Sequence, residues 1–330
     1  MGTLGQAPRK RCMGKVHVAV ASQDDRELVG FRHEVAFYEG VDGLPASVLP
    51  FLLEGVEHGE PMLVVMLPDR LHVLRDAMGQ LADRVEWVDM STVGGNPACI
   101  IPAWHDFVEA HPGPGPIRGI GEPIWLGRRG VEMAEAELHE ALLNLAFDGG
   151  PAWRLLCPYD VSALPGDVLE EALRNHPVRD GAQPVISYAG HAHALRTFSQ
   201  ELPAAPSDAT ALPFGRPDLG TVREVVRRAC EAARLHPSST DDVVLAAHEV
   251  AANSVQHADG GGWLLVWDEP GALVVEVRDH GHIYDPLVGR NPLDVASENG
   301  RGIWMANQLC DLVQVRSGEQ GTQVRLYAWL

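Results

Sequence analysis

Basic charge is what this sequence has least of. Its 26 lysines and arginines stand against 45 aspartates and glutamates, which gives a formal net charge of −19. Nucleic-acid binding depends on basic patches that neutralise phosphates, and no long basic run occurs in this chain. We therefore expect no direct nucleic-acid contact, and a protein or a small molecule as the partner.

Paired cysteines and long apolar runs are also lacking. The five cysteines stand singly, at Cys12, Cys99, Cys157, Cys230 and Cys310. Their spacing predicts neither a zinc site nor a disulfide framework, and we interpret Cys157 as a buried structural thiol. No window approaches the ~18–20 apolar residues of a membrane span, and the apolar stretch 16–21 is too short for a signal peptide. We expect a soluble, cytoplasmic protein.

The composition that is present predicts two globular domains. At 330 residues, with 45% hydrophobic and 22% charged residues, the chain exceeds the usual size of a single core. Residues 199–218 carry four prolines and little periodicity, which is typical of a linker. We divide the chain into a flexible N-terminus (1–28), a first domain (29–198), this linker and a second domain (219–330).

Short apolar runs alternate with helical patterns in the first domain. The predicted strands are 34–38, 62–67, 85–88, 117–120, 153–157 and 185–188. The predicted helices are 44–58, 69–81, 100–111, 131–147 and 165–175. Such alternation is typical of an α/β fold, here a mostly parallel sheet with helices on both faces.

Chemistry-bearing residues of the first domain follow its strands, where parallel sheets commonly bind ligands. The candidates for binding a small-molecule signal are Glu122, Trp125, Tyr159 and Asp160. Together with His33, Phe37-Tyr38, Cys157-Pro158 and His176-Pro177, they resemble the sensory domain described in methanogens and methylotrophs, which is itself similar to the RecA-type ATPase core. The chain has no Gly-x-x-x-x-Gly-Lys-Ser/Thr loop, so we expect this domain to bind without hydrolysing nucleotide.

Three pieces of the second domain carry its chemistry. A predicted helix after Pro237 places Glu249, Asn253 and His257 at four-residue intervals, on one helix face. The predicted strand 273–277 leads to Asp279 and Gly281, and the segment Gly300-Arg301-Gly302 opens an apolar helix. Backbone N–H groups at such a glycine-rich helix start suit phosphate.

The order and spacing of these pieces resemble the ATP-binding fold that histidine kinases, gyrase-type ATPases and anti-sigma-factor serine kinases share, with the last group most similar. The resemblance implies a two-layer α/β sandwich that binds ATP and Mg²⁺. By the same resemblance Glu249 is a general base, and Asn253 a Mg²⁺ ligand. The implied nucleotide contacts are Asp279 and Gly281 with adenine, Gly300, Arg301 and Gly302 with phosphates, and Thr322 near the adenine. His257 either orients a neighbour or caps its helix.

These resemblances lead to a functional hypothesis with open alternatives. We expect a bacterial, ATP-binding signalling regulator that binds a sigma factor or phosphorylates a serine or threonine of an antagonist protein, under control of the first domain. Anti-sigma kinases of this kind are commonly homodimers. Ile283 stands where the family has a further glycine, which favours the alternative of a non-catalytic ATP-binding module. A sensor histidine kinase is a further alternative, although helix 219–235 contains no histidine; a zinc protease is rejected because position 252 is alanine.

Overall fold

The computed structural model describes residues 30–113, 115–181, 183–291 and 300–330. The predicted flexible N-terminus, residues 1–28, and Cys12 within it lie outside the described residues.

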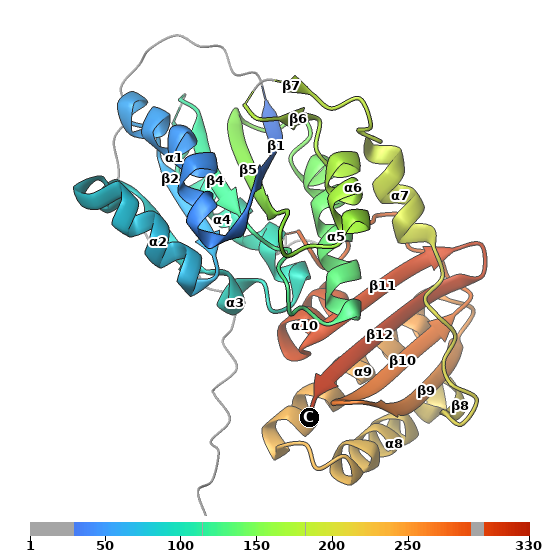
Figure 1. Cartoon of the computed structure of the whole chain (residues 1–330). Helices are drawn as coiled ribbons and strands as arrows, with labels where there is room; N and C mark the ends of the chain where they lie inside the picture. The colour runs from blue at the N-terminus through green and yellow to red at the C-terminus, as the bar shows by residue number, and fades with distance from the viewer. Residues whose placement is uncertain (1–29, 114, 182, 292–299) are drawn as a thin grey trace, which may run out of the picture.

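A seven-stranded sheet forms the centre of the first domain (Figure 1). Its strands are β1 (Phe31–Tyr38), β2 (Met62–Met66), β3 (Glu86–Asp89), β4 (Ile117–Gly121), β5 (Trp153–Asp160), β6 (Val178–Arg179) and β7 (Gln183–Pro184). The order is β3-β2-β4-β5-β1-β6-β7, and every pair except β6·β7 is parallel. Strands β2 and β4 are buried along their whole length, as expected for a sheet covered on both faces. The predicted fold class of this domain is confirmed.

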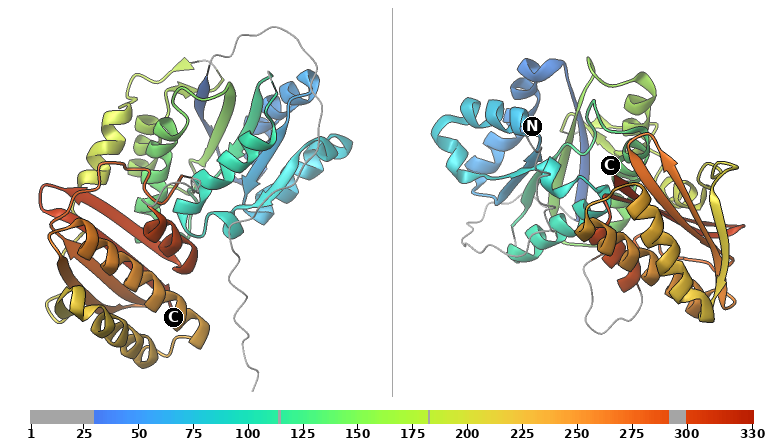
Figure 2. Two further views of the ribbon diagram at one scale, coloured as in Figure 1. Left: turned by 180° about the vertical axis from the view of Figure 1, so that it is seen from behind. Right: turned by 90° about the horizontal axis from the view of Figure 1, so that it is seen from below.

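Helices cover both faces of this sheet (Figure 2). They are α1 (Gly40–His58), α2 (Pro68–Met78), α3 (Met90–Val93), α4 (Ile100–Ala110), α5 (Gly130–Ala146), α6 (Gly166–Asn175) and α7 (His191–Ser199). The apolar side chains of α1 and α2 form one core with the sheet, and those of α4, α5 and α6 form a second core on the other face. Among the helices of the described ranges, none combines the length and apolar character needed to cross a membrane.

An antiparallel sheet of five strands forms the second domain. The strands are β8 (Thr210–Gly215), β9 (Gly261–Glu269), β10 (Ala272–Asp279), β11 (Leu312–Gly318) and β12 (Gly321–Trp329), in the order β11-β12-β10-β9-β8. Helices α8 (Leu219–Ala232), α9 (Pro237–His257) and α10 (Arg301–Leu309) share one core with one face of this sheet. The predicted two-layer α/β sandwich is therefore confirmed.

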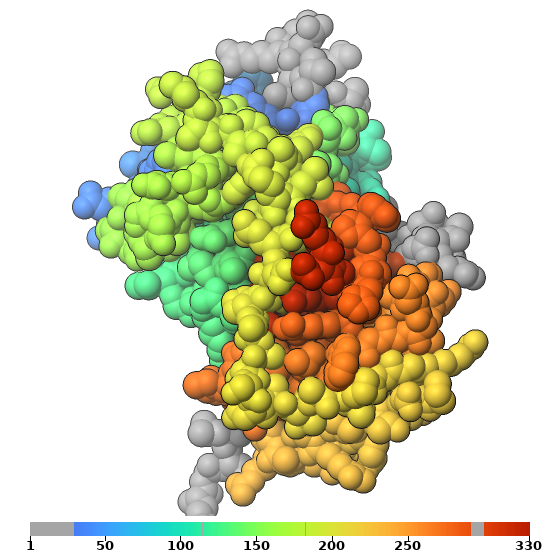
Figure 3. All heavy atoms as spheres, turned by 90° about the vertical axis from the view of Figure 1, so that its right-hand side faces the viewer, coloured from blue at the N-terminus to red at the C-terminus, as the bar shows by residue number. Residues whose placement is uncertain are grey.

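Two elements of the segment between the domains were not predicted. Helix α7 packs on α5 and on β11. Strand β8 lies inside the predicted linker and pairs with β9 of the second domain. Figure 3 shows this part of the chain as a yellow band that runs down beside the orange and red atoms of the second domain. Backbone groups fix it there: Leu202 N–H donates to Gln323 Oε1 at 2.8 Å, and Arg325 donates to Pro203 O at 2.7 Å. The proline-rich segment therefore lies on the surface of the second domain and includes a strand. We call residues 191–215, from α7 to β8, the strap.

One predicted strand is wrong. The run 185–188 was expected to be a strand, but the pairing stops at β7, and Ile186 is fully exposed. The hairpin ends where Val185 N–H donates to Pro177 O at 3.0 Å; Val185 is half-buried against the first core, but the chain leaves the sheet after it.

A buried carboxylate ties the two domains together. Glu135 of α5 is 0% exposed, and its oxygens accept hydrogen bonds from Arg290 at 3.0 Å, Arg316 at 2.5 Å and Gln314 at 3.2 Å. These three partners all belong to the second domain. A carboxylate shared by two guanidinium groups satisfies charges that would otherwise be buried without a partner.

A second contact lies beside this one. Asn96 of the first domain donates to both the carbonyl and the side-chain oxygen of Asn307 on α10, at 3.2 and 3.1 Å. Asn307 in turn donates to Gly289 O at 3.0 Å, and Leu287 packs against the core of the first domain. The chain that follows β10 is therefore held between the two domains.

The packing of the first core predicts that replacing two different tryptophans will destabilise the protein by different amounts. Trp104 is 1% exposed, and its ring fills space left by glycine, since a methyl group at Gly119 would lie 2.8 Å from it. We expect Trp104→Ala to lower the free energy of unfolding of the first domain by about 3–5 kcal/mol because of the cavity it leaves. Trp263→Ala is the matched control, since that ring is 49% exposed, and should cost about 1 kcal/mol or less. Urea unfolding measures both, and equal losses would contradict this packing.

Candidate functional site

Helix α9 carries two polar residues of the site that the sequence predicts in the second domain. It begins at Pro237, which suits a first helical position, with the His236 side chain accepting a hydrogen bond from Ser238 N–H at 3.3 Å. Glu249 and Asn253 are both half-buried one turn apart. Neither side chain hydrogen-bonds to another described residue, so both remain available to a ligand.

The start of α10 lies directly against Asn253. A methyl group at Gly302 would be only 2.4 Å from Asn253 Nδ2, so only glycine leaves room for the amide. Gly300 precedes the helix with φ 82°, a left-handed conformation that favours glycine. The structure thus places Asn253 against Gly302, two residues after Gly300. The free N–H groups of this helix start are the kind of donors that bind anions.

Asp279 lies on the other side of α9, at the end of β10. Its Oδ2 accepts a hydrogen bond from Ser254 Oγ at 2.5 Å, and its Oδ1 accepts one from Gly281 N–H at 2.8 Å. Thr322 donates to Gly281 O at 2.9 Å. Each carboxylate oxygen can accept more than one hydrogen bond, so Asp279 retains capacity for an amino group of a ligand.

Close backbone packing explains two glycines of this region. A methyl group at Gly281 would lie 2.7 Å from Ala258 Cβ, at the end of α9. Gly321 has φ 108°, and a methyl group there would lie 2.0 Å from Asp279 O. Both glycines therefore let the strand ends come together around Asp279. A cavity of about 760 Å³ opens beside them and reaches Asp279, Gly321 and Thr322 but not Asn253 or Gly302.

The residue that departs from the family pattern is fixed in place. Ile283 N–H donates to Ser317 Oγ at 2.8 Å, and the side chain packs against the core of the second domain. The chain after Gly281 is therefore held on the sheet at Ile283 by its backbone and by its side chain.

Two other predicted residues lie at the margin of this site. Arg301 is exposed in the first turn of α10. His257 is exposed in the last turn of α9, where an imidazole interacts favourably with the helix end.

The sensory-domain candidates do not form one site. Glu122, at the end of β4, is 1% exposed and accepts hydrogen bonds from Tyr38 and from Arg70 Nε, the latter at 3.0 Å. Burial raises the pKa of Glu122 to about 7, although Arg70 opposes the shift. Asp160, at the end of β5, accepts from Gly40 N–H at 3.0 Å and holds the start of α1. Glu122 and Asp160 share one edge of the sheet, as the topology requires.

Trp125 and Tyr159 are placed differently. The ring of Trp125 lies 3.6 Å from the Arg128 guanidinium carbon, a cation–π contact. Tyr159 points to the opposite face of the sheet from Asp160, because neighbouring residues of a strand alternate. Its hydroxyl donates to Glu140 Oε2 at 3.3 Å.

Sequence reasoning missed two hydroxyl groups of the second domain's site. Ser254 holds Asp279, and Ser317 holds Ile283 N–H and lies 3.0 Å from Thr322 Oγ1. Ser254 stands next to Asn253 in the sequence, and a serine in the buried part of a helix needs an acceptor. That requirement was the available signal for Ser254, whereas nothing in the sequence marks Ser317.

Comparison with protein families assigns each half of the chain. Residues 32–177 match the model described as "MEDS: MEthanogen/methylotroph, DcmR Sensory domain", and residues 216–328 match the model described as "Histidine kinase-like ATPase domain". This chain is a MEDS sensory domain followed by a histidine-kinase-like ATPase domain. Both resemblances expected from the sequence are thereby confirmed, and the site around Asn253 and Asp279 belongs to the ATPase domain.

Solved structures and curated proteins add little to this assignment. A crystal structure of the RsbU and RsbW domains of a protein from Mycobacterium tuberculosis is similar at 21% identity, with a TM-score of 0.29. The match covers 38% of this chain and 33% of that one, so it spans about a third of that chain's length. A similarity this weak supports no conclusion about the fold or function of this chain. No curated protein matches the chain.

The contact between Asn253 and Gly302 predicts a specific loss of nucleotide binding. We expect Gly302→Ala to displace the Asn253 amide and to weaken Mg-ATP binding at least about tenfold, roughly the worth of one hydrogen bond. The same change at Gly220, which is exposed in α8 with nothing near it, is the control and should leave binding unchanged. Isothermal calorimetry measures both affinities. Equal affinities for the two variants would separate Gly302 from the nucleotide site.

Proposed function

We propose that the ATPase domain is an ATP-dependent protein kinase of the anti-sigma-factor type, which binds a sigma factor or phosphorylates a serine or threonine of an antagonist protein. One observation carries the proposal: α9 brings together two half-sites. Asn253 lies against the glycine-rich start of α10, and the next residue, Ser254, holds Asp279 at the end of β10. One helix thus links a helix start suited to binding phosphate with a carboxylate suited to binding the adenine ring.

The residues present fit Mg-ATP in their chemistry. The amide oxygen of Asn253 is a hard ligand of the kind that Mg²⁺ shares with phosphates and water. Gly300 and Gly302 leave backbone donors uncovered at the helix start, and Arg301 adds charge there. Mg²⁺ would neutralise phosphate charge, which is most of what phosphoryl transfer requires.

The remaining residues are proposed to activate the acceptor hydroxyl group and to bind adenine. Glu249, with no hydrogen bond to another described residue, would accept the proton of an incoming hydroxyl group. Asp279 would accept from the exocyclic amine of adenine, with Gly281 and Thr322 shaping that end. The net charge of −19 favours a protein acceptor or a small molecule over nucleic acid.

Two alternatives differ in specific features. A histidine kinase would need a two-helix dimerisation segment with an exposed histidine before the ATP domain. Here α8 contains no histidine, and only a short 3-10 turn separates it from β8, which is paired into the sheet. A non-catalytic ATP-binding module is favoured by Ile283, whose anchored backbone restrains the chain after Gly281.

Control of the ATPase domain by the sensory domain is supported by the contacts of Glu135. Arg290 and Leu287 belong to the chain between Asp279 and α10, and both contact the first domain. Arg316 and Gln314 belong to β11, one strand from the Thr322 end of the site. A movement of α5 would therefore be transmitted to the chain that connects the two half-sites.

The enzymatic part of the proposal is tested by a pair of substitutions. We expect Asp279→Asn to weaken Mg-ATP binding by about tenfold or more, because it removes the charged acceptor while keeping the shape. Glu249→Ala should keep the affinity for Mg-ATP within about twofold of the wild-type value. It should abolish transfer of the γ-phosphate to an antagonist protein, because it removes only the general base. Calorimetry measures binding, and radiolabelled ATP with candidate antagonist proteins measures transfer.

Other outcomes decide against parts of the proposal. If the wild type binds Mg-ATP and Glu249→Ala transfers phosphate at the wild-type rate, Glu249 is not the base. If the wild type binds but transfers to no acceptor, the non-catalytic module is favoured. Failure of the wild type to bind would exclude the ATP site altogether.

The coupling between the domains is tested at Glu135. We expect Glu135→Gln to destabilise the chain by about 3–5 kcal/mol, because two buried arginines lose their shared anion. Glu137→Gln is the control on the same helix: it faces Glu171 and Asp167 within the first domain, and burial raises its pKa to about 7, so neutralising it should cost little. Scanning calorimetry checks this, and a loss for Glu135→Gln no larger than the control's would show that the interface contributes no stability.

A further inference from the structure

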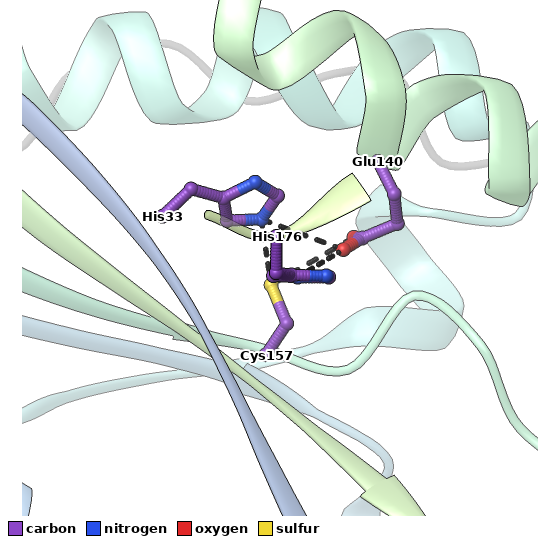
Figure 4. Close-up of side chains that lie close together, drawn as sticks. All are labelled: His33, Glu140, Cys157 and His176. Atoms are coloured by element: carbon purple, nitrogen blue, oxygen red, sulfur yellow. Dashed lines mark hydrogen bonds and ion pairs between the residues drawn. The ribbon is translucent and has the colours of Figure 1, made fainter. Parts of the chain in front are cut away.

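Four metal-binding side chains converge inside the sensory domain, away from the ATP site. They are His33 on β1, Glu140 on α5, Cys157 on β5 and His176 directly after α6. Figure 4 shows them pointing toward one another between the sheet and the helices. All four are buried, with exposures of 0%, 0%, 1% and 0%. One donor atom from each lies within 4.8 Å of all the others.

The spacing of the donor atoms matches a tetrahedral ion. His33 Nε2 lies 3.3 Å from Cys157 Sγ and 3.4 Å from Glu140 Oε2. His176 Nε2 lies 2.9 Å from Glu140 Oε2, and Cys157 Sγ lies 3.8 Å from Glu140 Oε1. Tetrahedral zinc with bonds of about 2.0–2.3 Å places its ligands about 3.3–3.8 Å apart. Three of the four distances lie within this range, and His176 Nε2 and Glu140 Oε2, now 2.9 Å apart, must separate for the four side chains to share one ion.

The orientation of His176 is an independent sign of a ligand. Its Nδ1 lies 2.7 Å from Ala172 O, and this hydrogen bond fixes the ring with the proton on Nδ1. Its Nε2 is buried and lies 2.9 Å from Glu140 Oε2, so a cation, either a proton or a metal ion, must lie between the two atoms. A buried imidazole held through Nδ1 to a backbone carbonyl, with Nε2 directed at other donor atoms, is the usual orientation of a metal-binding histidine.

Charge balance supports the same conclusion. Glu140 is fully buried and makes no ion pair with a lysine or arginine in the described part of the chain; its neighbours are histidines. A divalent ion bound by a carboxylate, a thiolate and two neutral imidazoles is neutral overall, which suits this interior. The Tyr159 hydroxyl orients Glu140 from outside the set.

We propose that His33, Glu140, Cys157 and His176 form a closed tetrahedral site for a zinc-class divalent transition metal. Nitrogen, oxygen and sulfur ligands together suit Zn²⁺ and Co²⁺ and disfavour Mg²⁺ and Ca²⁺, which take oxygen ligands. All four positions are filled by protein, so the ion is a structural or sensed ion and not a catalytic one. When the metal–sulfur bond forms, the thiol proton of Cys157 leaves to solvent. The proposal does not depend on the kinase function.

The test is a titration of the chelator-treated full chain with Co²⁺, in the absence of nucleotide. We expect one Co²⁺ per chain, with a thiolate-to-cobalt charge-transfer band and the visible bands of tetrahedral Co²⁺, both displaced by Zn²⁺. Cys157→Ser should abolish the thiolate band, and His176→Gln should weaken binding more than about 100-fold, since losing even an outer partner costs about 10–100-fold. Cys230→Ser, at a buried cysteine of the other domain, is the matched control and should keep the band.

Thermal unfolding separates loss of binding from loss of folding. Zn²⁺ should raise the unfolding temperature of the wild type and of Cys230→Ser by mass action but leave that of Cys157→Ser unchanged. The proposal is overturned if the wild type binds no Co²⁺ at micromolar concentration. It is also overturned if the bound ion has no thiolate band, or if the band survives Cys157→Ser.

Discussion

The arrangement of this molecule depends on a carboxylate that is buried between its domains. Glu135 has no access to water, so its charge is tolerable only because Arg290 and Arg316 approach it from the second domain. Such a pair contributes less net stability than its geometry suggests, since three ions lose hydration. Its larger effect is on specificity, because any other docking of the domains leaves a buried charge without a partner.

The position of Glu135 on α5 connects the two functional regions. Glu140, five residues later on the same helix, belongs to the proposed metal site, and Glu135 contacts the chain between Asp279 and α10. A helix is stiff along its axis, so a change at one carboxylate moves the other. The sensory domain thereby has a direct physical connection to the ATPase domain. A second link is the strap, since α7 packs on both α5 and β11 and β8 pairs with β9.

Sequence patterns predicted much of the fold, for local reasons. The helix expected at 131–147 is α5 at Gly130–Ala146, and the strand expected at 153–157 lies within β5. Both follow from apolar periodicity, which depends on neighbouring residues. The errors fall at the edges. Residues 185–188 have an apolar strand pattern but no partner strand, and 210–215 have the prolines of a loop yet pair with β9. Edge pairing depends on what the rest of the sheet offers, which a local pattern does not contain.

By itself, the sequence determined the two domain types and the spacing of the residues proposed to bind ATP, because those residues stand on one helix face and at a strand end. Glu249 and Asn253 share a face of α9 whatever the tertiary structure. Only the tertiary structure placed Ser254 against Asp279, joined Glu135 to Arg290 and Arg316, and gathered His33, Glu140, Cys157 and His176. These four are separated by up to 143 residues and lie on β1, α5 and β5 and directly after α6. A single cysteine in sequence thus looks structural, and only the parallel pairing of β1 with β5 and the packing of α5 and α6 over them reveal its neighbours.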